Sequence, residues 1–491
     1  MEWKNKKQPS FFASILLLVL VAFIMVYGIM IAGLKTEFIL ISAGTIVTLF
    51  AILHGQKWDS IMEIMSQKIK TAVLAILILY SIGLIIGTWM ISGTIPYFIY
   101  FGLEIINPQY LYILAFLATA VVSTCTGTSF GSAGTIGVAI MGIAGAMDVN
   151  LAITAGAVIS GAYFGDKLSP LSDTTNMSSL IAEVDLYQHI KHLMFTSVPS
   201  MLTAALVFFL VGLNIDATEI MDANVSGVSS TIEQIFNWNP ILFLPAIIII
   251  AGSVMKKPTV VVLFLSSFTA MLIALFVQQV SFPLVIQAAI EGFNVEMMLS
   301  ALPNLEISSD LQTLLNRGGI YSMHGTILFV FCAFFFASAL EASQVFNVVF
   351  SRVFSYIKTA TNTILVSLIS GLAIILATGN SYITFFLMKE IFSEQYRKQS
   401  LHQLNLSRSM EDGGMIPEAL VPWTLAGVYM ATTLGVSVFD YAPWALFNML
   451  GIVFSAILAI IGPYTNWFGI KREKISQENN SKHFPEKRIT G

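Results

Sequence analysis

The stretch GAYFGDKLSPLSDTTN, residues 161–176, places ionisable and helix-breaking residues inside a long apolar run of sequence. It contains two carboxylates, Asp166 and Asp173, together with Lys167 and Pro170. Such residues are costly at the depth of a lipid bilayer, so they occur mainly where they line a cavity or handle an ion. The stretch therefore predicts a transport site. Its other oxygen-bearing candidates are Ser172, Thr174, Thr175 and Asn176.

Asp173 is the leading candidate, because it follows Ser172 and is not adjacent to a basic residue. A carboxylate away from water can exchange a proton for a cation, since desolvation favours the protonated form and a bound cation favours the ionised form. Competition for one carboxylate is the simplest physical route to antiport. Asp166 has an alternative role, because the adjacent Lys167 could hold it in a structural ion pair. Either carboxylate could instead cap the N-terminus of a helix.

Two further polar clusters are expected at the tips of hairpins that turn within the membrane. A break at that depth frees backbone carbonyl groups, which suit a small hard cation because such ions prefer oxygen. Gly127 and Gly379 would let the backbone approach closely. The alternative is that these small residues serve helix packing or bond to the preceding turn. The side-chain oxygens of the two clusters belong to Thr126, Thr128 and Ser129 in the first and to Thr378, Asn380 and Ser381 in the second.

A second pair of carboxylates, Glu411 and Asp412, takes the equivalent place in the second half of the chain, and Glu418 follows one turn further on. They could form a second cation or proton site. They could equally be cytoplasmic charges at the start of a helix. Lys389 is, besides Lys167, the other candidate for a cation that binds an anion.

The elements that must position these residues are membrane helices. Apolar residues make up 56% of the chain and charged residues 11%, whereas a soluble chain carries roughly a quarter charged residues. Apolar windows long enough to cross roughly 30 Å of hydrocarbon are expected at 11–33, 37–54, 71–93, 193–213, 239–255, 259–278, 320–341 and 442–463. The chain is therefore predicted to be an all-α polytopic membrane protein with about 10 spans.

The basic residues test the sidedness of this layout. If the N-terminus is cytoplasmic, 20 of the 24 Lys and Arg residues fall on the cytoplasmic side, which satisfies the positive-inside rule. This requires that 109–147 and 361–398 are re-entrant hairpins, each followed by a broken helix. The halves then have opposite orientations, which is an inverted-topology repeat, a plan common among secondary transporters.

The predicted organisation has four parts. The first inverted repeat covers 1–213, with its hairpin at 109–147 and its broken helix at 150–182. Residues 214–238 form an outer loop. The second inverted repeat covers 239–470, with its hairpin at 361–398 and its broken helix at 411–436. Residues 471–491 form a polar cytoplasmic tail.

Several of these motifs resemble the NhaC-type Na+/H+ antiporter family of the ion transporter superfamily. The resemblance rests on GAYFGDKLSPLSDTTN, the upstream GTSFGSAGTIGVAI, ATGNSYI and the EDGG…PW…AGVYMATTLGV stretch, and it runs from about residue 10 to 470. It implies a bacterial inner-membrane protein with two hairpins and two broken helices. Where the family pattern has Ser or Thr after EDGG, this chain has Met415-Ile416. The family also contains malate/lactate exchangers, so the resemblance leaves the substrate open.

The leading hypothesis is therefore secondary active Na+/H+ antiport, with Li+ or K+ as further candidate ions. Na+ is expected at the residues named above, led by Asp173. The alternative is a malate-H+/Na+-lactate exchanger, for which helix N-termini would have to replace scarce basic residues. A channel is disfavoured, because paired hairpins with carboxylates suit alternating access.

Other classes of function find no support in the sequence. No HExxH, paired Cys or phosphate-loop motif predicts an enzyme or a cofactor, and no cluster of basic residues predicts a nucleic-acid partner. The expected partners are the ions, the lipid bilayer and, by analogy, a second copy in a homodimer. The expected location is the bacterial inner membrane, with both termini in the cytoplasm.

Overall fold

A computed structural model describes residues 9–215, 231–255, 257–299, 312, 315–353, 358–466 and 468–473. Most of the predicted outer loop at 214–238 and of the tail at 471–491 lies outside these residues. The described chain is helical, and its only β-type pairing is an isolated bridge between Leu401 and Arg472. The prediction of an all-α fold is confirmed.

The first half runs from α1 to α10, and some of its helices follow the apolar windows of the sequence, whereas the helix at 94–105 lies in no expected window. The bounds of its helices are α1 Phe11–Val26, α2 Thr36–Leu53, α3 Trp58–Ile91, α4 Thr94–Ile105, α5 Leu111–Thr126, α6 Ser129–Ser132, α7 Val138–Ala146, α8 Leu151–Leu168, α9 Asp173–Ile181 and α10 Leu186–Gly212. A π-helical turn, η3 (Ala133–Gly137), joins α6 to α7.

The second half has the bounds α13 Leu244–Val254, α14 Thr259–Phe276, α15 Phe282–Ile290, α16 Glu296–Leu299, α18 His324–Ala342, α19 Val345–Val353, α20 Ala360–Thr378, α21 Ser381–Lys398, α22 Gln403–Met410, α23 Leu425–Leu434, α24 Val438–Tyr441 and α25 Leu446–Ile461. Between α22 and α23 lie a π-helical turn, η7 (Glu411–Met415), and a 3-10 turn, η8 (Ile416–Leu420).

Seven helices of the described chain are long and apolar enough to cross a membrane. The number rises to eight if Ile76–Ile91 and Thr94–Ile105, which meet at a bend of 68°, count as one span. Four shorter apolar helices add to these: Phe11–Met25, Pro240–Gly252, Val260–Phe276 and Leu425–Leu434. The prediction of a polytopic membrane protein is confirmed, whereas the number of about 10 spans is not.

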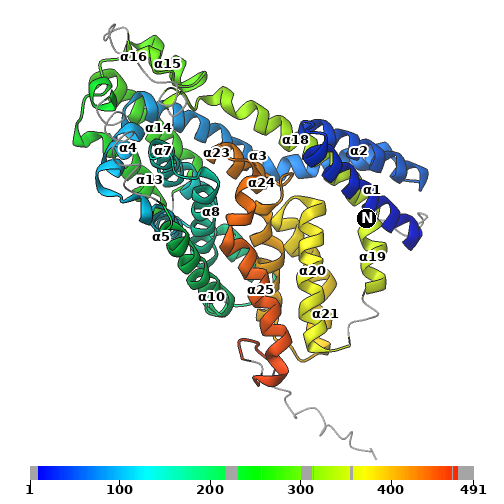
Figure 1. The fold of residues 1–491 in the computed structure, drawn as a ribbon. Coiled ribbons are helices and arrows are strands. Elements are labelled where there is room, and N and C mark those ends of the chain that lie inside the picture. The colour runs from blue at the N-terminus through cyan, green and yellow to red at the C-terminus, as the bar shows by residue number, and fades with distance from the viewer. Residues whose placement is uncertain are drawn as a thin grey trace, which may run out of the picture.

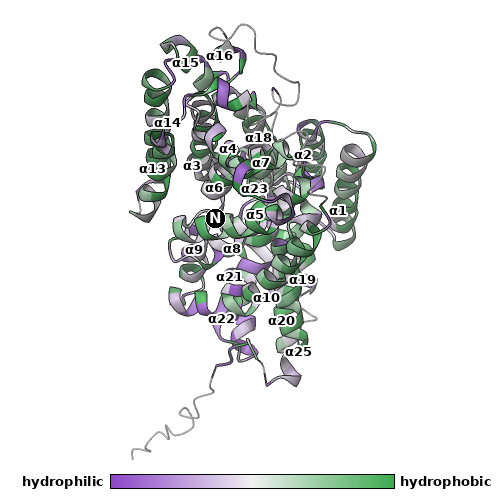
Figure 2. Ribbon diagram, turned by 60° about the vertical axis from the view of Figure 1, so that its left-hand side comes forward, coloured by the Kyte–Doolittle hydropathy of each residue, from purple (hydrophilic) through white to green (hydrophobic). Residues whose placement is uncertain are grey.

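The outer surface is apolar in the way that a lipid-facing surface requires. Large apolar side chains are exposed along α1, α2, α10 and α14, among them Phe12 at 77% and Phe276 at 77%. Figure 2 shows these helices as predominantly green, whereas purple segments gather on α21 and α22. A surface of this kind in water would be an aggregation liability, so its contact with lipid is the physical reason for its composition.

The two halves repeat the same succession of helix ends at an offset of 252 residues. The pairs are Thr126 and Thr378 (ends of α5 and α20), Ala146 and Lys398 (ends of α7 and α21), Leu151 and Gln403 (starts of α8 and α22), and Asp173 and Leu425 (starts of α9 and α23). The sides of the membrane from which the matching helices enter stay a prediction.

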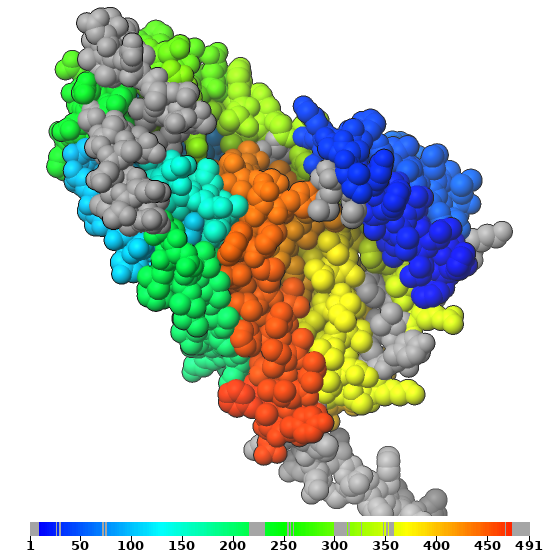
Figure 3. All heavy atoms as spheres, viewed as in Figure 1, coloured from blue at the N-terminus to red at the C-terminus, as the bar shows by residue number. Residues whose placement is uncertain are grey.

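The helices around the two breaks pack side by side. In the first half α5 packs along α8, and in the second half α20 packs against α21 and α22. Figures 1 and 3 show α25, in orange-red, between α10 in green and α20 in yellow, so that α25 joins the two halves. Glycines make the α5–α8 contact close, because a Cβ on Gly161 would lie 2.2 Å from the Phe116 carbonyl oxygen.

Candidate functional site

Four interruptions of the helices surround one polar cavity. We call the turns at Thr126–Ser129 and Thr378–Ser381 tip one and tip two, and the gaps at Ser169–Ser172 and Val421–Thr424 break one and break two. The central cavity between them has a volume of about 160 Å³. Its polar lining comprises three carboxylates and seven other polar side chains: Asp166, Asp173, Glu418, Thr128, Ser129, Tyr163, Thr174, Asn380, Ser381 and Tyr382.

Asp166 lies on the last turn of α8 and is only 3% exposed. The backbone N–H and the hydroxyl of Ser129 in tip one both donate to its Oδ2, at 3.2 and 2.8 Å. Its Oδ1 has no hydrogen-bond partner in the described structure. One oxygen of this carboxylate is thus held in place while the other remains available for a further contact.

Tip one can reach Asp166 because the chain turns sharply at Gly127. Gly127 has φ = 70°, a left-handed conformation that favours glycine. A Cβ there would lie 2.6 Å from the backbone carbon of Leu171 in break one. The absent side chain therefore allows tip one and break one to touch.

Glu418, on η8, repeats this arrangement in the second half. Its Oε2 accepts a hydrogen bond from the hydroxyl of Ser381 in tip two. Serine and carboxylate are separated by 37 residues in both pairs, and Glu418 is 8% exposed. The sequence prediction grouped Glu418 with Glu411 and Asp412 as a second candidate site and did not pair it with Ser381. The signal that could have found it is the register of TGTS onto TGNS, which aligns Pro170 with Pro422 and Asp166 with Glu418.

Asp173 lies at the first position of α9 and differs from Asp166 in being exposed. Its Oδ2 accepts a hydrogen bond of 2.5 Å from the hydroxyl of Tyr382, which comes from α21 of the other half. Asp173 also lines a second, open cavity with Asn176, Leu180 and neighbouring residues. It therefore lines both cavities. Tyr382 is a cavity residue that the sequence prediction missed.

The remaining candidates of the first broken helix divide into lining and supporting residues. Thr174 lines the central cavity. Ser172 caps α9 by accepting from the Thr175 N–H at 3.2 Å, and the Thr175 hydroxyl donates to the Lys167 carbonyl at 3.1 Å. Asn176 donates to the Ser172 carbonyl at 2.6 Å. These three side chains hold break one in shape.

Thr126 and Thr378, the first residues of the two tips, also have supporting contacts. The hydroxyls of Thr126 and Ser132 lie 3.2 Å apart, and those of Thr378 and Thr384 lie 3.2 Å apart. Each bond closes its tip across six residues. The same contact therefore stabilises both tips.

Glu411 and Asp412 are fully buried but do not line the central cavity. Asp412 forms an ion pair with Lys167, and it accepts from the Thr196 hydroxyl at 3.3 Å. Glu411 accepts from the Ser178 hydroxyl at 2.6 Å. Because Lys167 pairs with Asp412, the neighbouring Asp166 is bonded to Ser129 of tip one and not to Lys167.

The charge of the central cavity follows from these pairings. Lys389 donates to the Ile181 carbonyl at 2.9 Å and pairs with Glu183 at 3.0 Å. Lys389 thus caps the C-terminal end of α9. Among the described residues that line the central cavity there are three carboxylates and no Lys, Arg or His. Such a cavity attracts a cation and repels an anion.

The described residues contain no group of three or more His, Cys, Asp or Glu side chains placed to hold a metal ion together. The carboxylate and hydroxyl oxygens that line the central cavity are hard ligands. That donor set suits a monovalent hard cation better than a resident transition metal.

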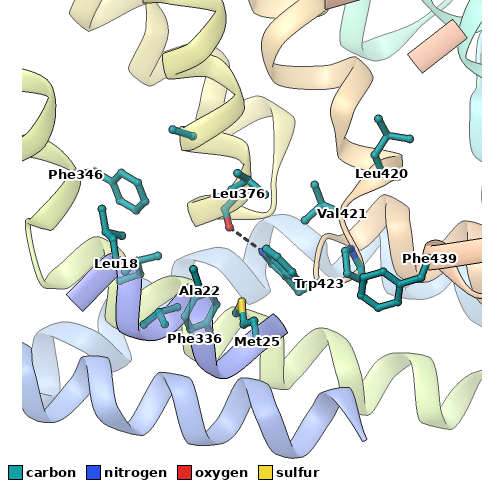
Figure 4. A pocket seen from close by; sticks show the side chains of 14 residues that line it. Leu18, Ala22, Met25, Phe336, Phe346, Leu376, Leu420, Val421, Trp423 and Phe439 are labelled. Atoms are coloured by element: carbon teal, nitrogen blue, oxygen red, sulfur yellow. Dashed lines mark hydrogen bonds between the residues drawn. The ribbon is translucent and has the colours of Figure 1, made fainter. Parts of the chain in front are cut away.

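A separate pocket of about 460 Å³ is lined in part by break two, and its lining residues are apolar. Figure 4 shows it between Leu18 and Met25 of α1, Phe336 of α18, and Leu420 and Val421 at the start of break two. The Trp423 side chain forms one wall of the pocket, and its indole N–H donates to the Leu376 carbonyl at 2.8 Å. Among the described residues that line this pocket there is no carboxylate, hydroxyl or basic side chain.

Comparison with known proteins agrees with this chemistry. The family model described as Na+/H+ antiporter family matches residues 161–463, which include both breaks and tip two. An uncharacterized Na(+)/H(+) antiporter of Haemophilus influenzae is 45% identical over 83% of this chain and 86% of its own length. The Na(+)/H(+) antiporter NhaC of Bacillus subtilis is 32% identical over 84% of this chain and 89% of its own. The malate-2H(+)/Na(+)-lactate antiporter of the same species is 31% identical over 95% of this chain and 97% of its own.

Proposed function

Because the chain belongs to the Na+/H+ antiporter family, we propose that it exchanges Na+ for H+ across a membrane, with Asp166 as the carboxylate for which the two ions compete. The observation that carries this proposal is the central cavity, which is lined by carboxylates and hydroxyls and by no described basic residue.

Asp166 suits the shared role because of its burial and its one free oxygen. A carboxylate away from water is stable only when it is neutralised, either by a proton or by a cation. Na+ can bind at the unpartnered Oδ1 with the oxygens of tip one, and a proton can replace it. The Na+-bound form and the protonated form of Asp166 are both neutral, so in either form the protein can change between the states that open to opposite sides of the membrane. In the empty, ionised form it cannot. That difference couples the two fluxes.

We assign Asp173, to which the sequence alone gives the leading role, to the mouth of the cavity. Its exposure and its bond to Tyr382 support a part in attracting the cation and closing the cavity behind it. Ser129, Thr128 and Thr174 complete the cation-binding oxygens on the first half.

The topology belongs to the same proposal. Two re-entrant hairpins and two inverted repeats would bring tip one and tip two to the cavity from opposite sides of the membrane. The constant offset of helix ends supports the repeat. The distribution of Lys and Arg supports cytoplasmic termini in a bacterial inner membrane, although two of the twenty residues counted there, Lys68 and Arg408, are buried.

The test uses inverted vesicles from an antiporter-deficient strain, in which a pH-gradient dye is followed after respiration. Added NaCl should collapse the gradient, and the apparent KM for Na+ should rise as the pH falls, because protons compete for Asp166. Asp166→Asn should abolish the response at normal protein levels, while Asp440→Asn, an exposed carboxylate outside the cavity, should not change it. Retained Na+-dependent exchange in Asp166→Asn would disprove the assignment.

The second candidate function is exchange of malate and lactate, which the 31% identical relative suggests. It needs a positive group to meet the carboxylates of the substrate, and Lys167 and Lys389 are both engaged elsewhere. In the same vesicles, a response that requires malate and lactate and is absent with NaCl would favour this function.

A further inference from the structure

The apolar pocket beside break two takes no part in the proposed exchange. It has a volume of about 460 Å³, and α1, α18, α20 and break two form most of its walls (Figure 4). We propose that this pocket is a lipid site, which holds an acyl chain of a membrane phospholipid against break two. The inference goes beyond the exchange of Na+ for H+ and does not depend on it.

The lining of the pocket decides against water and ions as its contents. Among the described lining residues, the only side-chain nitrogen or oxygen is the indole nitrogen of Trp423, whose N–H already donates to the Leu376 carbonyl at 2.8 Å. A buried water needs roughly two to four polar partners, so a cavity lined by hydrocarbon does not hold it. If the pocket were empty, its walls would lose the van der Waals contacts that close packing supplies. The pocket therefore favours an apolar occupant.

The face of α20 that lines the pocket continues into the lipid-facing surface. Ile369, Ala373 and Leu376 are spaced by four and three residues, so they share one face of this helix. Ala373 and Leu376 line the pocket, whereas Ile369, one turn earlier, is 68% exposed. Because α20 is long and apolar enough to cross a membrane, an exposed isoleucine on it faces lipid. Lipid next to α20 is thus continuous with the pocket along one apolar stripe.

The other edges of the pocket are apolar and exposed as well. Ala22 of α1 lines the pocket and is exposed, and the neighbouring Val19 and Phe23 are 61% and 62% exposed. Phe439 of α24 lines the pocket and is 40% exposed. The pocket therefore reaches the same surface of α1 that is expected to contact the bilayer.

An acyl chain matches this pocket better than a protein segment does. A protein segment brings backbone N–H and C=O groups, which need hydrogen-bond partners when they are buried. The lining offers a single side-chain donor, that of Trp423, and it is already engaged. A hydrocarbon chain brings no polar group and gains van der Waals contacts on all sides. The bilayer also supplies such chains at a high local concentration.

The bound chain would lie against break two itself. Val421, Pro422 and Trp423 belong to break two and line the pocket. Three residues before Val421, Glu418 lines the central cavity. An acyl chain that packs on break two therefore restrains the segment next to a cavity carboxylate. The site thus makes membrane lipid a structural part of the interrupted helix.

The experiment places a photoreactive side chain inside the pocket. Phe336 lines the pocket and is 2% exposed, so p-benzoylphenylalanine in its place samples the interior and not the protein surface. The full-length protein is reconstituted in vesicles of phosphatidylethanolamine and phosphatidylglycerol, irradiated, and weighed by intact mass spectrometry. We expect an adduct with the added mass of one phospholipid, and fragmentation should place the new bond on an acyl chain.

Two matched controls carry the same photoreactive group at other phenylalanines. Phe116 is fully buried and does not line the pocket, so the group there should form no lipid adduct. Phe12 is 77% exposed on α1, so the group there should form an adduct with bulk lipid.

A filled pocket gives the complementary test. Ala373→Phe adds a ring inside the pocket and should lower the lipid adduct at Phe336 about tenfold, because the ring takes up volume that the chain would occupy. The adduct at Phe12 should not change. Ala22→Phe fills the pocket from the opposite wall and serves if Ala373→Phe does not fold.

The other outcomes overturn the proposal. If the group at Phe12 captures lipid but the group at Phe336 captures none, the pocket is not a lipid site. A cross-linked dimer from Phe336 would place a second copy in the pocket, and an adduct within the same chain would place a segment of this protein there. A lipid adduct at Phe336 that persists in both filled variants would show that the chain binds elsewhere. If the group at Phe336 prevents folding, Phe439 at the edge of the pocket carries it instead.

Discussion

Among single residues, Ser129 has the most direct contact with the proposed cation site. Its hydroxyl and its backbone N–H hold the same oxygen of Asp166, whereas the other oxygen is buried and has no hydrogen-bond partner among the described residues. In Ser129→Ala the N–H remains but the hydroxyl is lost. A hydrogen bond to a charged group contributes enough that its loss should raise the apparent KM for Na+ about tenfold. The measurement is a Na+ titration in inverted vesicles.

The control for this variant is Ser200→Ala, which removes a buried hydroxyl that donates to the Thr196 carbonyl within α10. Its KM should equal that of the wild type. If Ser129→Ala also keeps the wild-type KM, the hydroxyl does not help to bind the cation and tip one only closes the cavity.

The sequence indicates Asp166, Asp173 and both tip serines as polar residues near interruptions of the helices, but it could not say which of them meet. Burial separates Asp166 from Asp173, and burial depends on tertiary packing that no local pattern encodes. Glu411 and Asp412 illustrate the same limit, because the partner of Asp412 is Lys167 from the other half of the chain. The roles of these residues in transport stay predictions.

At the scale of elements, the two tips provide a matched test of backbone geometry. Gly127 and Gly379 both have left-handed φ values, 70° and 65°. Alanine at either position costs about 1–2 kcal/mol for that conformation. Only at Gly127 does the new Cβ also collide, at 2.6 Å from Leu171, whereas at Gly379 its nearest neighbour is 3.6 Å away. Gly127→Ala should therefore abolish transport, and Gly379→Ala should only reduce it. Equal rates in vesicles with equal protein levels would contradict this.

The ion pair between Lys167 and Asp412 joins α8 to η7, and both side chains are fully buried. Removing one partner leaves an unpaired buried charge, so Lys167→Met should destabilise the fold by about 3–5 kcal/mol. The double variant Lys167→Met/Asp412→Leu removes both charges and should recover most of that loss. Thermal unfolding of the purified protein in detergent measures both. A double variant no more stable than Lys167→Met would show that the pair contributes more than charge balance.

Helix positions were more predictable than helix partners, because a span is encoded by its own apolar residues. The expected spans at 37–54 and 259–278 correspond to α2 and α14 within a few residues. The bend between α3 and α4 was not predicted. The expected span 71–93 ends at Gly93, which has φ = 81° and is the N-cap of α4, but no helix was expected to start there.

For the whole molecule, the repeat makes a prediction about sidedness. The turns that follow the two hairpins contain Asp148 and Ser400, which are 252 residues apart and share the left-handed φ of 52°. If the repeats are inverted, equivalent turns must lie on opposite sides of the membrane. Asp148 should then be external and Ser400 cytoplasmic.

Single cysteines at these two positions test that arrangement, after Cys125 and Cys332, both free thiols, are replaced by Ser and Ala. A membrane-impermeant maleimide should label Asp148→Cys in right-side-out vesicles and Ser400→Cys in inverted vesicles. Labelling of both from the same side would mean that the repeats are parallel. Tip one and tip two would then enter from the same side, and alternating access could not arise from exchanging the roles of the two halves. Opposite labelling would instead leave the cavity between two elements that are equivalent in structure and reversed in direction, which is what a carrier needs to expose Asp166 to each side in turn.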